Sequence, residues 1–219
     1  MSNYIVLDLE MCMVALHSRT HEYSLKHEII QIGAVKLDER YEELSRFTTF
    51  VKPKYGKVDA FIKDLTGITR EDVAQANDLA KAVDEFLNWI GNDEAICVSW
   101  SMSDKYQFKK EMRSKGIINE KINALYNTWI DCQQLFSDKS HTERSWSLAE
   151  ALIASGIDSK GHAHNGLIDS LNTAILFRKL MTEDDFKMIE AYEKVRYGES
   201  AHLCVSIGDL IQGMSVRSL

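Results

Sequence analysis

The sequence contains two carboxylates whose spacing suits them to hold a divalent cation. Asp8 and Glu10 come directly after the apolar run of residues 4–7, which predicts a short buried strand. Side chains two residues apart project from the same face of a strand, so both acids gather where this strand ends. Their repulsion is costly unless a cation lies between them, and oxygen ligands without thiolates suit Mg²⁺ or Mn²⁺. Two solvated acids at a strand end are the alternative interpretation.

A further acid, Asp169, follows His164 by five residues. On one helix, residues five apart point about 140° away from each other, so these side chains converge only if His164 lies in a loop that enters the helix. Gly161 and Gly166 favour such a loop. A histidine beside a metal held by carboxylates would accept a proton from water near neutral pH. A histidine at a helix terminus with a surface acid is the alternative.

Asp104 follows the buried strand predicted for residues 95–98 and begins a basic helix predicted for 104–115. Considered alone, it is typical of an acid in the first turn of a helix, where it would stabilise the fold by about 0.5–2 kcal/mol.

The other predicted elements describe one α/β domain with a mixed five-stranded sheet flanked by helices. Three strands over 4–7, 29–37 and 46–51 form an antiparallel meander, and the segment 11–27 between the first two is expected to be a mobile surface loop. Two further strands, 95–98 and 129–130, alternate with helices and lie parallel in the sheet. Helices are predicted over 78–91, 104–115, 145–155, 167–181 and about 183–196.

Composition limits the classes of function. The 219 residues carry 33 Asp and Glu against 26 Lys and Arg, a net charge of −7, which disfavours a protein that coats nucleic acid without specificity. The four cysteines, Cys12, Cys97, Cys132 and Cys204, form no C-x-x-C pair and predict reduced thiols in a cytoplasmic protein. Neither a signal peptide nor an apolar run that would span a membrane is expected.

In this order the acids and the histidine resemble the DEDDh family of 3′→5′ exonucleases, the DnaQ-like and RNase T-like enzymes. Asp8-Leu9-Glu10 matches the family's Asp-x-Glu motif, and His164 with Asp169 matches its His-x₄-Asp motif. The second motif supplies one Asp. Some relatives carry it directly after Trp, where this chain has Ser101, and others four residues after Trp, which gives Asp104.

The chain is most similar to the KapD-like and histone-mRNA-exonuclease-like branch. The resemblance lies in residues 27–33, in the Leu-Thr-Gly-Ile-Thr block of residues 61–69 and in Ser145-Trp146-Ser147-Leu148. It spans roughly residues 4–181. We therefore expect an exonuclease domain over 1–182 and a helical extension over 183–219 that packs on the same domain.

The resemblance implies an RNase H-like fold and hydrolysis of single-stranded nucleic acid from its 3′ end to nucleoside 5′-monophosphates. Asp8, Glu10, Asp104 and Asp169 would hold two Mg²⁺ or Mn²⁺ ions about 3.5–4 Å apart, and His164 would act as the base. Substrate contacts are expected from Met11, Cys12, Met13, Trp100 and His164, although the branch often has Thr where this chain has Cys12. A homodimer or a targeting partner is compatible with the family.

RNA is the favoured substrate, judged by the branch. Three alternatives stay open: a DNA exonuclease, a catalytically idle module that binds nucleic acid or protein, and a zinc site made by His162, His164 and a cysteine. The zinc site explains the observations poorly, because no cysteine is near these histidines in the sequence and the carboxylates would have no role.

Overall fold

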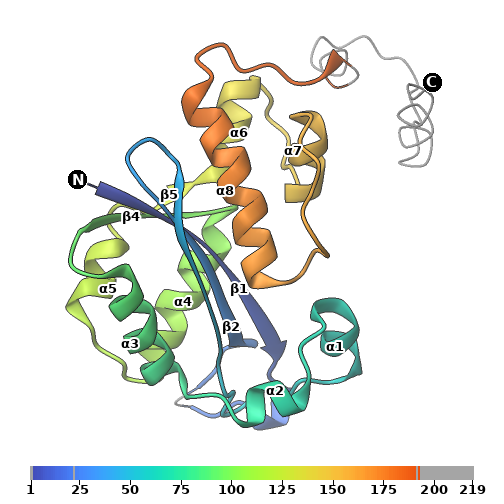
Figure 1. The fold of residues 1–219 in the computed structure, drawn as a ribbon. Coiled ribbons are helices and arrows are strands. Elements are labelled where there is room, and N and C mark those ends of the chain that lie inside the picture. Colours follow the sequence, from blue (N-terminus) through green and yellow to red (C-terminus); the bar gives the residue numbers. More distant parts are fainter. Residues whose placement is uncertain (1, 22, 191, 193–219) are drawn as a thin grey trace.

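A five-stranded sheet forms the centre of the fold (Figure 1). The computed structural model describes residues 2–21, 23–190 and 192. The strands are β1 (Ser2–Met13), β2 (His27–Leu37), β3 (Glu43–Phe50), β4 (Glu94–Ser99) and β5 (Ile130–Asp131). Their order in the sheet is β3-β2-β1-β4-β5, with β1, β2 and β3 antiparallel and β4 and β5 parallel to β1. The predicted mixed sheet is confirmed.

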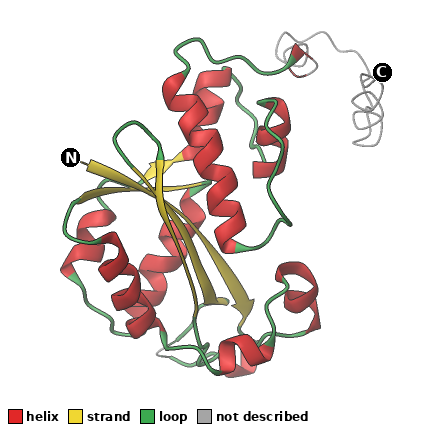
Figure 2. Ribbon diagram, viewed as in Figure 1, coloured by secondary structure: helices red, strands yellow, loops and turns green. Residues whose placement is uncertain are grey.

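Helices cover both faces of this sheet (Figure 2). One face packs against α3 (Leu79–Ile90), α4 (Met102–Ser114) and α5 (Glu120–Leu125). The other face packs against α6 (Cys132–Ser140), α7 (Leu148–Ala154) and α8 (Gly166–Thr182). Two short helices, α1 (Ala60–Thr66) and α2 (Arg70–Ala74), lie near the C-terminal end of β1 (Figure 1). A 3-10 turn, η1 (Leu16–Ser18), follows β1.

Successive side chains of β1 lie on opposite faces of the sheet. Ile5, Leu7 and Leu9 are buried in the core cluster beneath α3, α4 and α5. Val6 is buried in the cluster beneath α6, α7 and α8. Because the strand has a period of two, Asp8 lies on the same face as Val6 and therefore on the side that α8 covers.

The segment between the first two strands is shorter than predicted. The strand β1 continues to Met13, and β2 begins at His27, so these ends pair with each other instead of forming a loop. Within the remaining segment, Tyr23 is fully buried and its ring stacks on that of Tyr55 at a centroid distance of 4.4 Å. The prediction of a surface loop is therefore wrong at both ends of the segment and at Tyr23.

The predicted helices over 78–91, 104–115, 145–155 and 167–181 correspond to α3, α4, α7 and α8. The sequence pattern did not predict α1, α2, α5 and α6, which are 5 to 9 residues long and show little of the helical period. Among the described helices, none combines the length and apolar composition that a membrane span needs.

The helix predicted for about 183–196 is wrong over residues 183–189, which form a turn and irregular backbone. Phe186 and Met188 are both buried against the cluster beneath α8, and burial of alternate residues is typical of extended chain. The Ile189 N–H also donates to the Ala154 carbonyl at 2.8 Å, which fastens this segment to α7. Most of the expected extension, residues 191 and 193–219, lies outside the described residues.

Candidate active site

Three carboxylates from two distant parts of the chain meet on the face of the sheet that α8 covers. Oxygen atoms of Asp8, Glu10 and Asp169 all lie within 4.8 Å of one another. Asp8 and Glu10 come from β1, and Asp169 comes from the first turn of α8. Within the described part of the chain, this is the single group of His, Cys, Asp and Glu side chains that is close enough to hold a metal ion.

Two glycines let α8 approach the sheet closely enough to bring Asp169 to Asp8. Gly33 is the partner of Asp8 across the β1–β2 ladder. A Cβ atom on Gly33 would overlap the backbone of Gly166 and Leu167, and one on Gly166 would lie 3.1 Å from the Asp8 carbonyl oxygen. The bare backbones of β2 and α8 therefore touch beside the carboxylates.

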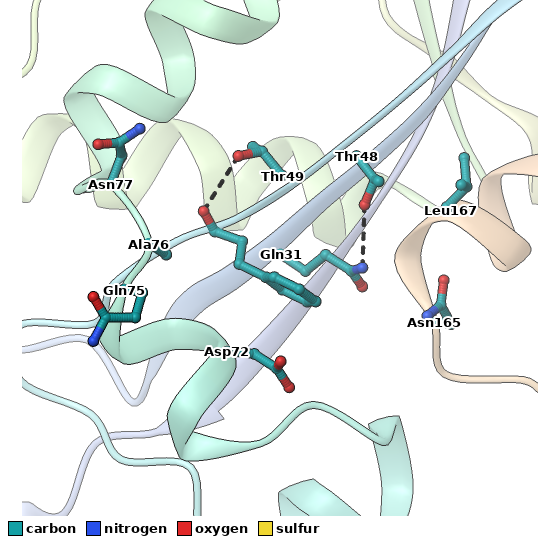
Figure 3. Close-up of a pocket in the computed structure, with 10 residues that line it drawn as sticks. Gln31, Thr48, Thr49, Asp72, Gln75, Ala76, Asn77, Asn165 and Leu167 are labelled. Carbon is teal, nitrogen blue, oxygen red and sulfur yellow. Dashed lines mark hydrogen bonds between the residues drawn. The ribbon is translucent and has the colours of Figure 1, made fainter.

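Gln31 fastens this helix terminus to the sheet (Figure 3). Its buried side-chain oxygen accepts from the Gly166 N–H at 2.9 Å, and its amide nitrogen donates to Thr48 Oγ1 at 3.2 Å. Gln31 and Thr48 border a separate hollow of about 570 Å³ that none of the clustered carboxylates line. The amide thus satisfies a helix N–H that would otherwise be buried without a partner.

Asp104 lies close to the other three acids, on the side of β1 that faces β4. The ladder between β1 and β4 ends at the pair Val6 and Val98, so the N–H of Leu9 has no strand partner on that side. It donates instead to Asp104 Oδ1 at 3.3 Å. Ser101 is the N-cap of α4, and the buried Asp104 follows in the first turn. Asp104 is next to Asp8 but does not belong to the group within 4.8 Å.

Burial raises the pKa values of all four acids, and the charges of neighbouring acids raise those of Asp8 and Glu10 further. Burial is the largest cause for Asp8, and the charges of Asp104, Glu10 and Asp169 raise its pKa further above the ordinary value. Burial, with Asp169 and Asp104, raises the pKa of Glu10 to about 8. Burial raises the pKa of Asp104 to about 7 and also raises that of Asp169.

The chemistry of this donor set fits a divalent cation. Across the described residues, the ion pairs that lysine and arginine form involve none of these four acids. Four neighbouring carboxylates that form no ion pair with lysine or arginine are stabilised by a bound metal ion, and an all-oxygen set favours Mg²⁺ or Mn²⁺.

His164 lies in the loop before α8, as its spacing from Asp169 requires. Its backbone has a positive φ of 63°, and its N–H donates to Asp169 Oδ2 at 2.7 Å. The side chain is exposed and lines the pocket that contains the carboxylates, whereas His162 is not among the lining residues. The backbone therefore holds the His164 ring at the edge of the acidic group and fixes the Asp169 carboxylate at the same time.

The carboxylates open into a pocket of about 580 Å³ with an apolar wall. Asp8, Glu10, Asp169 and His164 form its polar side, and Lys160 is the lysine that lines it. The apolar side chains include Met11, Met13, Phe61, Leu65 and Trp100. Met13, Phe61 and Leu65 are 46%, 67% and 39% exposed, which is unusual for large apolar side chains and leaves surface free for a ligand.

Cys12 does not take part in this pocket, so its expected substrate contact is not available to the side chain. Cys12 is fully buried with Ile30 and Val58 in a third core cluster. The cause is the segment of Gly56 and Val58, which covers Cys12: a Cβ on Gly56 would lie 2.5 Å from Cys12 Sγ. Met11, Met13 and Trp100, by contrast, line the pocket, and their contact with substrate stays a prediction.

Phe61 and Leu65 are pocket residues that the spacing of charged residues did not reveal. They lie on α1, more than 50 residues after β1, and were noted only as part of a block that resembles a family. The signal in the sequence that could have found them is a pair of large apolar residues, Phe61 and Leu65, next to the charged Lys63 and Asp64. Cys12, Cys97 and Cys132 are buried free thiols, so none of them joins His162 and His164 in a zinc site.

Comparison with known proteins identifies the family. The sequence profile of the exonuclease family (RNase_T) matches residues 5–177. The zebrafish (Danio rerio) protein ERI1 exoribonuclease 2 is 29% identical over 183 residues, which cover 71% of this chain and 32% of that protein. The DNA polymerase III subunit epsilon of Aquifex aeolicus is 25% identical over 186 residues, covering 84% of this chain and 83% of that protein.

The fold agrees with this assignment. The solved nuclease domain of 3′hExo, a DEDDh family member bound to rAMP, superposes with a TM-score of 0.70 at 20% identity, covering 86% of this chain and 96% of that one. The chain spans about a third or less of the first curated relatives that it matches. The expected RNase H-like fold and the resemblance to DEDDh enzymes are confirmed, and the chain belongs to the exonuclease family.

Proposed function

We propose that this chain is a metal-dependent 3′→5′ exonuclease that hydrolyses single-stranded nucleic acid, with RNA as the favoured substrate. The observation that carries the proposal is the group of Asp8, Glu10 and Asp169 oxygens within 4.8 Å of one another, with His164 held beside them by Asp169. Membership of the exonuclease family supports it, as does the similarity to a protein named as an exoribonuclease.

The four acids are the proposed ligands of two Mg²⁺ or Mn²⁺ ions. Asp8 is proposed as the ligand shared by both ions, because the other three acids all raise its pKa and therefore lie around it. Bound divalent ions would supply the positive charge that activates a water molecule and stabilises the leaving 3′ oxygen. Asp104 contributes from the edge of the site, where its bond to the Leu9 N–H fixes the position of the carboxylate.

His164 is proposed to accept the proton from the attacking water. Its ring is exposed at the pocket and can exchange that proton with solvent, while the backbone bond to Asp169 keeps its position. Release of the terminal residue as a nucleoside 5′-monophosphate follows if the bond on the 3′-oxygen side of the scissile phosphate breaks.

The apolar wall is proposed to receive the terminal nucleoside. Met11, Met13, Phe61, Leu65 and Trp100 offer apolar surface to a base, and stacking of a base on an aromatic ring contributes about 1–3 kcal/mol. Such contacts accept any base, because each base has an aromatic face. The wall supports binding of an unpaired 3′ end, which can be separated from its neighbours and enter the pocket.

DNA is the second candidate substrate, because the chain is also similar to a DNA polymerase III subunit epsilon. Incubation of matched single-stranded RNA and DNA with Mg²⁺, Mn²⁺ or EDTA separates the proposals. We expect faster digestion of RNA and none in EDTA. Faster digestion of DNA would support the second candidate, and no digestion of either with both metals would indicate a catalytically idle module.

We also propose a cytoplasmic location and a partner that helps to select substrates. Buried reduced thiols at Cys12, Cys97 and Cys132 suit the cytoplasm, which keeps cysteines reduced. A second copy of the chain or a targeting partner is proposed to help select substrates, because the net charge of −7 gives weak attraction to phosphates away from the pocket.

A further inference from the structure

A buried ionic cluster of Glu28, Glu111 and Lys115 lies outside the carboxylate site. Lys115 Nζ is 2.7 Å from Glu28 Oε1 and 2.9 Å from Glu111 Oε1. Both glutamate side chains are completely buried, and that of Lys115 is 12% exposed. Burial of three charges costs free energy unless hydrogen bonds satisfy them, so the remaining partners of the cluster indicate what it holds in place.

Glu28 gathers three consecutive backbone N–H groups. Its carboxylate accepts from Lys54 at 2.7 Å, from Tyr55 at 2.8 Å and from Gly56 at 2.6 Å. Burial alone would raise the pKa of Glu28, but Lys115 and these N–H groups outweigh it, and the pKa lies below its ordinary value. The charged carboxylate therefore fixes the backbone of the segment between β3 and α1.

This segment leads directly into the apolar wall of the pocket. The Lys57 N–H donates to the Met13 carbonyl at 3.3 Å, and α1 begins three residues later at Ala60. The wall residues Phe61 and Leu65 lie on this helix. The next helix, α2, packs on the same core cluster as α1 and Val58, so the segment that Glu28 holds and both helices share one core.

Glu111 ties the cluster to the other side of the pocket. Its Oε2 accepts from the Ile29 N–H at 2.9 Å, at the irregularity where β1 passes from Glu10 to Met11. Glu111 lies on α4, whose first turn carries Asp104. One cluster therefore joins the wall of the pocket to β2, which pairs with the acid-bearing strand β1, and to α4, which carries Asp104.

We propose that Glu28 and Lys115 are positioning residues that hold the α1 wall at a fixed place relative to the carboxylates, and so set the affinity for the terminal nucleotide. Neither residue touches the pocket. The inference rests on the proposed function, because a wall that binds the 3′ nucleotide is what the cluster would position.

The direct test is Glu28→Gln, which removes the charge and keeps the shape. A loosened wall weakens binding of substrate and transition state alike, so we expect KM for a single-stranded RNA to rise about tenfold with kcat within about twofold. Mn²⁺ affinity should not change, and the amides of residues 54–56 should exchange hydrogen faster. The conservative variant Lys115→Arg, which keeps the positive charge of the cluster, should raise KM less than Glu28→Gln does.

A second variant moves the same segment without changing a charge. A Cβ on Gly56 would lie 2.5 Å from Cys12 Sγ and 3.2 Å from the Met13 carbonyl oxygen. Gly56→Ala should therefore raise KM in the same way, and adding Cys12→Ala, which removes the sulfur, should lower it again. Gly56→Ala decides the question if Glu28→Gln does not fold.

Arg178→Met is the matched control, because it breaks an exposed ion pair of 2.6 Å with Glu42 that is far from the pocket in the fold. It should leave KM unchanged. A fall in kcat with KM unchanged, in Glu28→Gln or Gly56→Ala, would overturn the proposal in favour of a structural role. If the unsubstituted chain digests nothing, the proposed function fails. Two measurements on the Glu28→Gln variant then still decide whether the cluster positions the wall: hydrogen exchange of the amides of residues 54–56 and the affinity for a single-stranded oligonucleotide.

Discussion

At the scale of single residues, the acids and the histidine have separable roles. Asp8 and Glu10 were predicted to share a face because a strand has a period of two, and their oxygens do lie together with that of Asp169. The five-residue spacing also predicted that His164 would lie in a loop, and its positive φ and its bond to Asp169 agree. The sequence could not reveal that Cys12 is buried in the core, because the segment that covers it, around Gly56 and Val58, lies more than 40 positions later in the chain.

The two neighbouring histidines give a sharp test of the proposed base. His164→Ala should lower kcat by about 100-fold or more, because the proton acceptor is lost, while Mn²⁺ binding is retained. His162→Ala is the matched control, since His162 is exposed and does not line the pocket. Steady-state kinetics of both variants check the assignment. Equal losses in the two variants would remove His164 from its proposed role.

The raised pKa values predict how pH affects the metal-free protein. Glu10 has a pKa of about 8, raised from 4.5, so the folded state binds more protons than the unfolded state between these values. This contribution to stability is complete below about pH 4.5 and is lost as the pH rises through 8. In EDTA, Tm should therefore fall by at least about 3 °C between pH 5.5 and 8.

Addition of Mn²⁺ should raise Tm more at pH 8 than at pH 5.5, because protons compete with the metal for the same oxygens. Calorimetry of Glu10→Gln provides the comparison, since that variant loses the titrating group and should show a weaker dependence on pH. A Tm that increases across this range without metal would contradict the electrostatic description of the site.

At the scale of elements, the site depends on how closely α8 approaches the sheet. The sequence predicted β1 and α8 separately, each from its own periodicity. Their contact depends on Gly33 and Gly166, which are 133 positions apart in the chain. A single sequence carries no signal for such a pair. The same limit applies to the cluster of Glu28, Glu111 and Lys115, whose members lie on β2 and α4 and share no pattern in the sequence.

Substitution of Gly33 by Ala should separate α8 from β2 and disturb the carboxylates. We expect a loss of about 1–3 kcal/mol in the free energy of unfolding, as for other overpacked sites, together with a large loss of activity and of metal affinity. Chemical denaturation and calorimetric Mn²⁺ titration measure the two effects. Gly91→Ala is the control, because Gly91 caps the far end of α3 and its substitution costs stability without reaching the site. Normal metal affinity in Gly33→Ala would show that the close approach is unnecessary.

At the scale of the whole molecule, the negative charge limits how nucleic acid is bound. The net charge of −7 includes the four acids of the site, which bound cations would offset. Lys160 lines the pocket, and the exposed Lys54 and Lys57 lie on the segment that leads to α1. We therefore propose these three lysines as local phosphate contacts on a molecule whose net charge otherwise repels the nucleic-acid backbone.

This distribution of charge predicts a weak dependence of binding on salt. If three lysines contact phosphates, the logarithm of affinity for a single strand should fall with the logarithm of salt concentration at a slope of about −2. Fluorescence anisotropy with a catalytically inactive His164→Ala protein measures this slope. A slope steeper than about −5 would require a broad basic surface that this composition does not provide.

The central claim is that the acidic group removes nucleotides from a free 3′ end with the help of divalent ions. A single-stranded RNA labelled at its 5′ end tests it directly, with a second copy blocked by a 3′-phosphate. The expected result is a ladder that shortens from the 3′ end in Mg²⁺ or Mn²⁺ and is absent in EDTA, with the Asp169→Asn variant or on the blocked strand. Digestion that persists in EDTA or in Asp169→Asn would contradict the account.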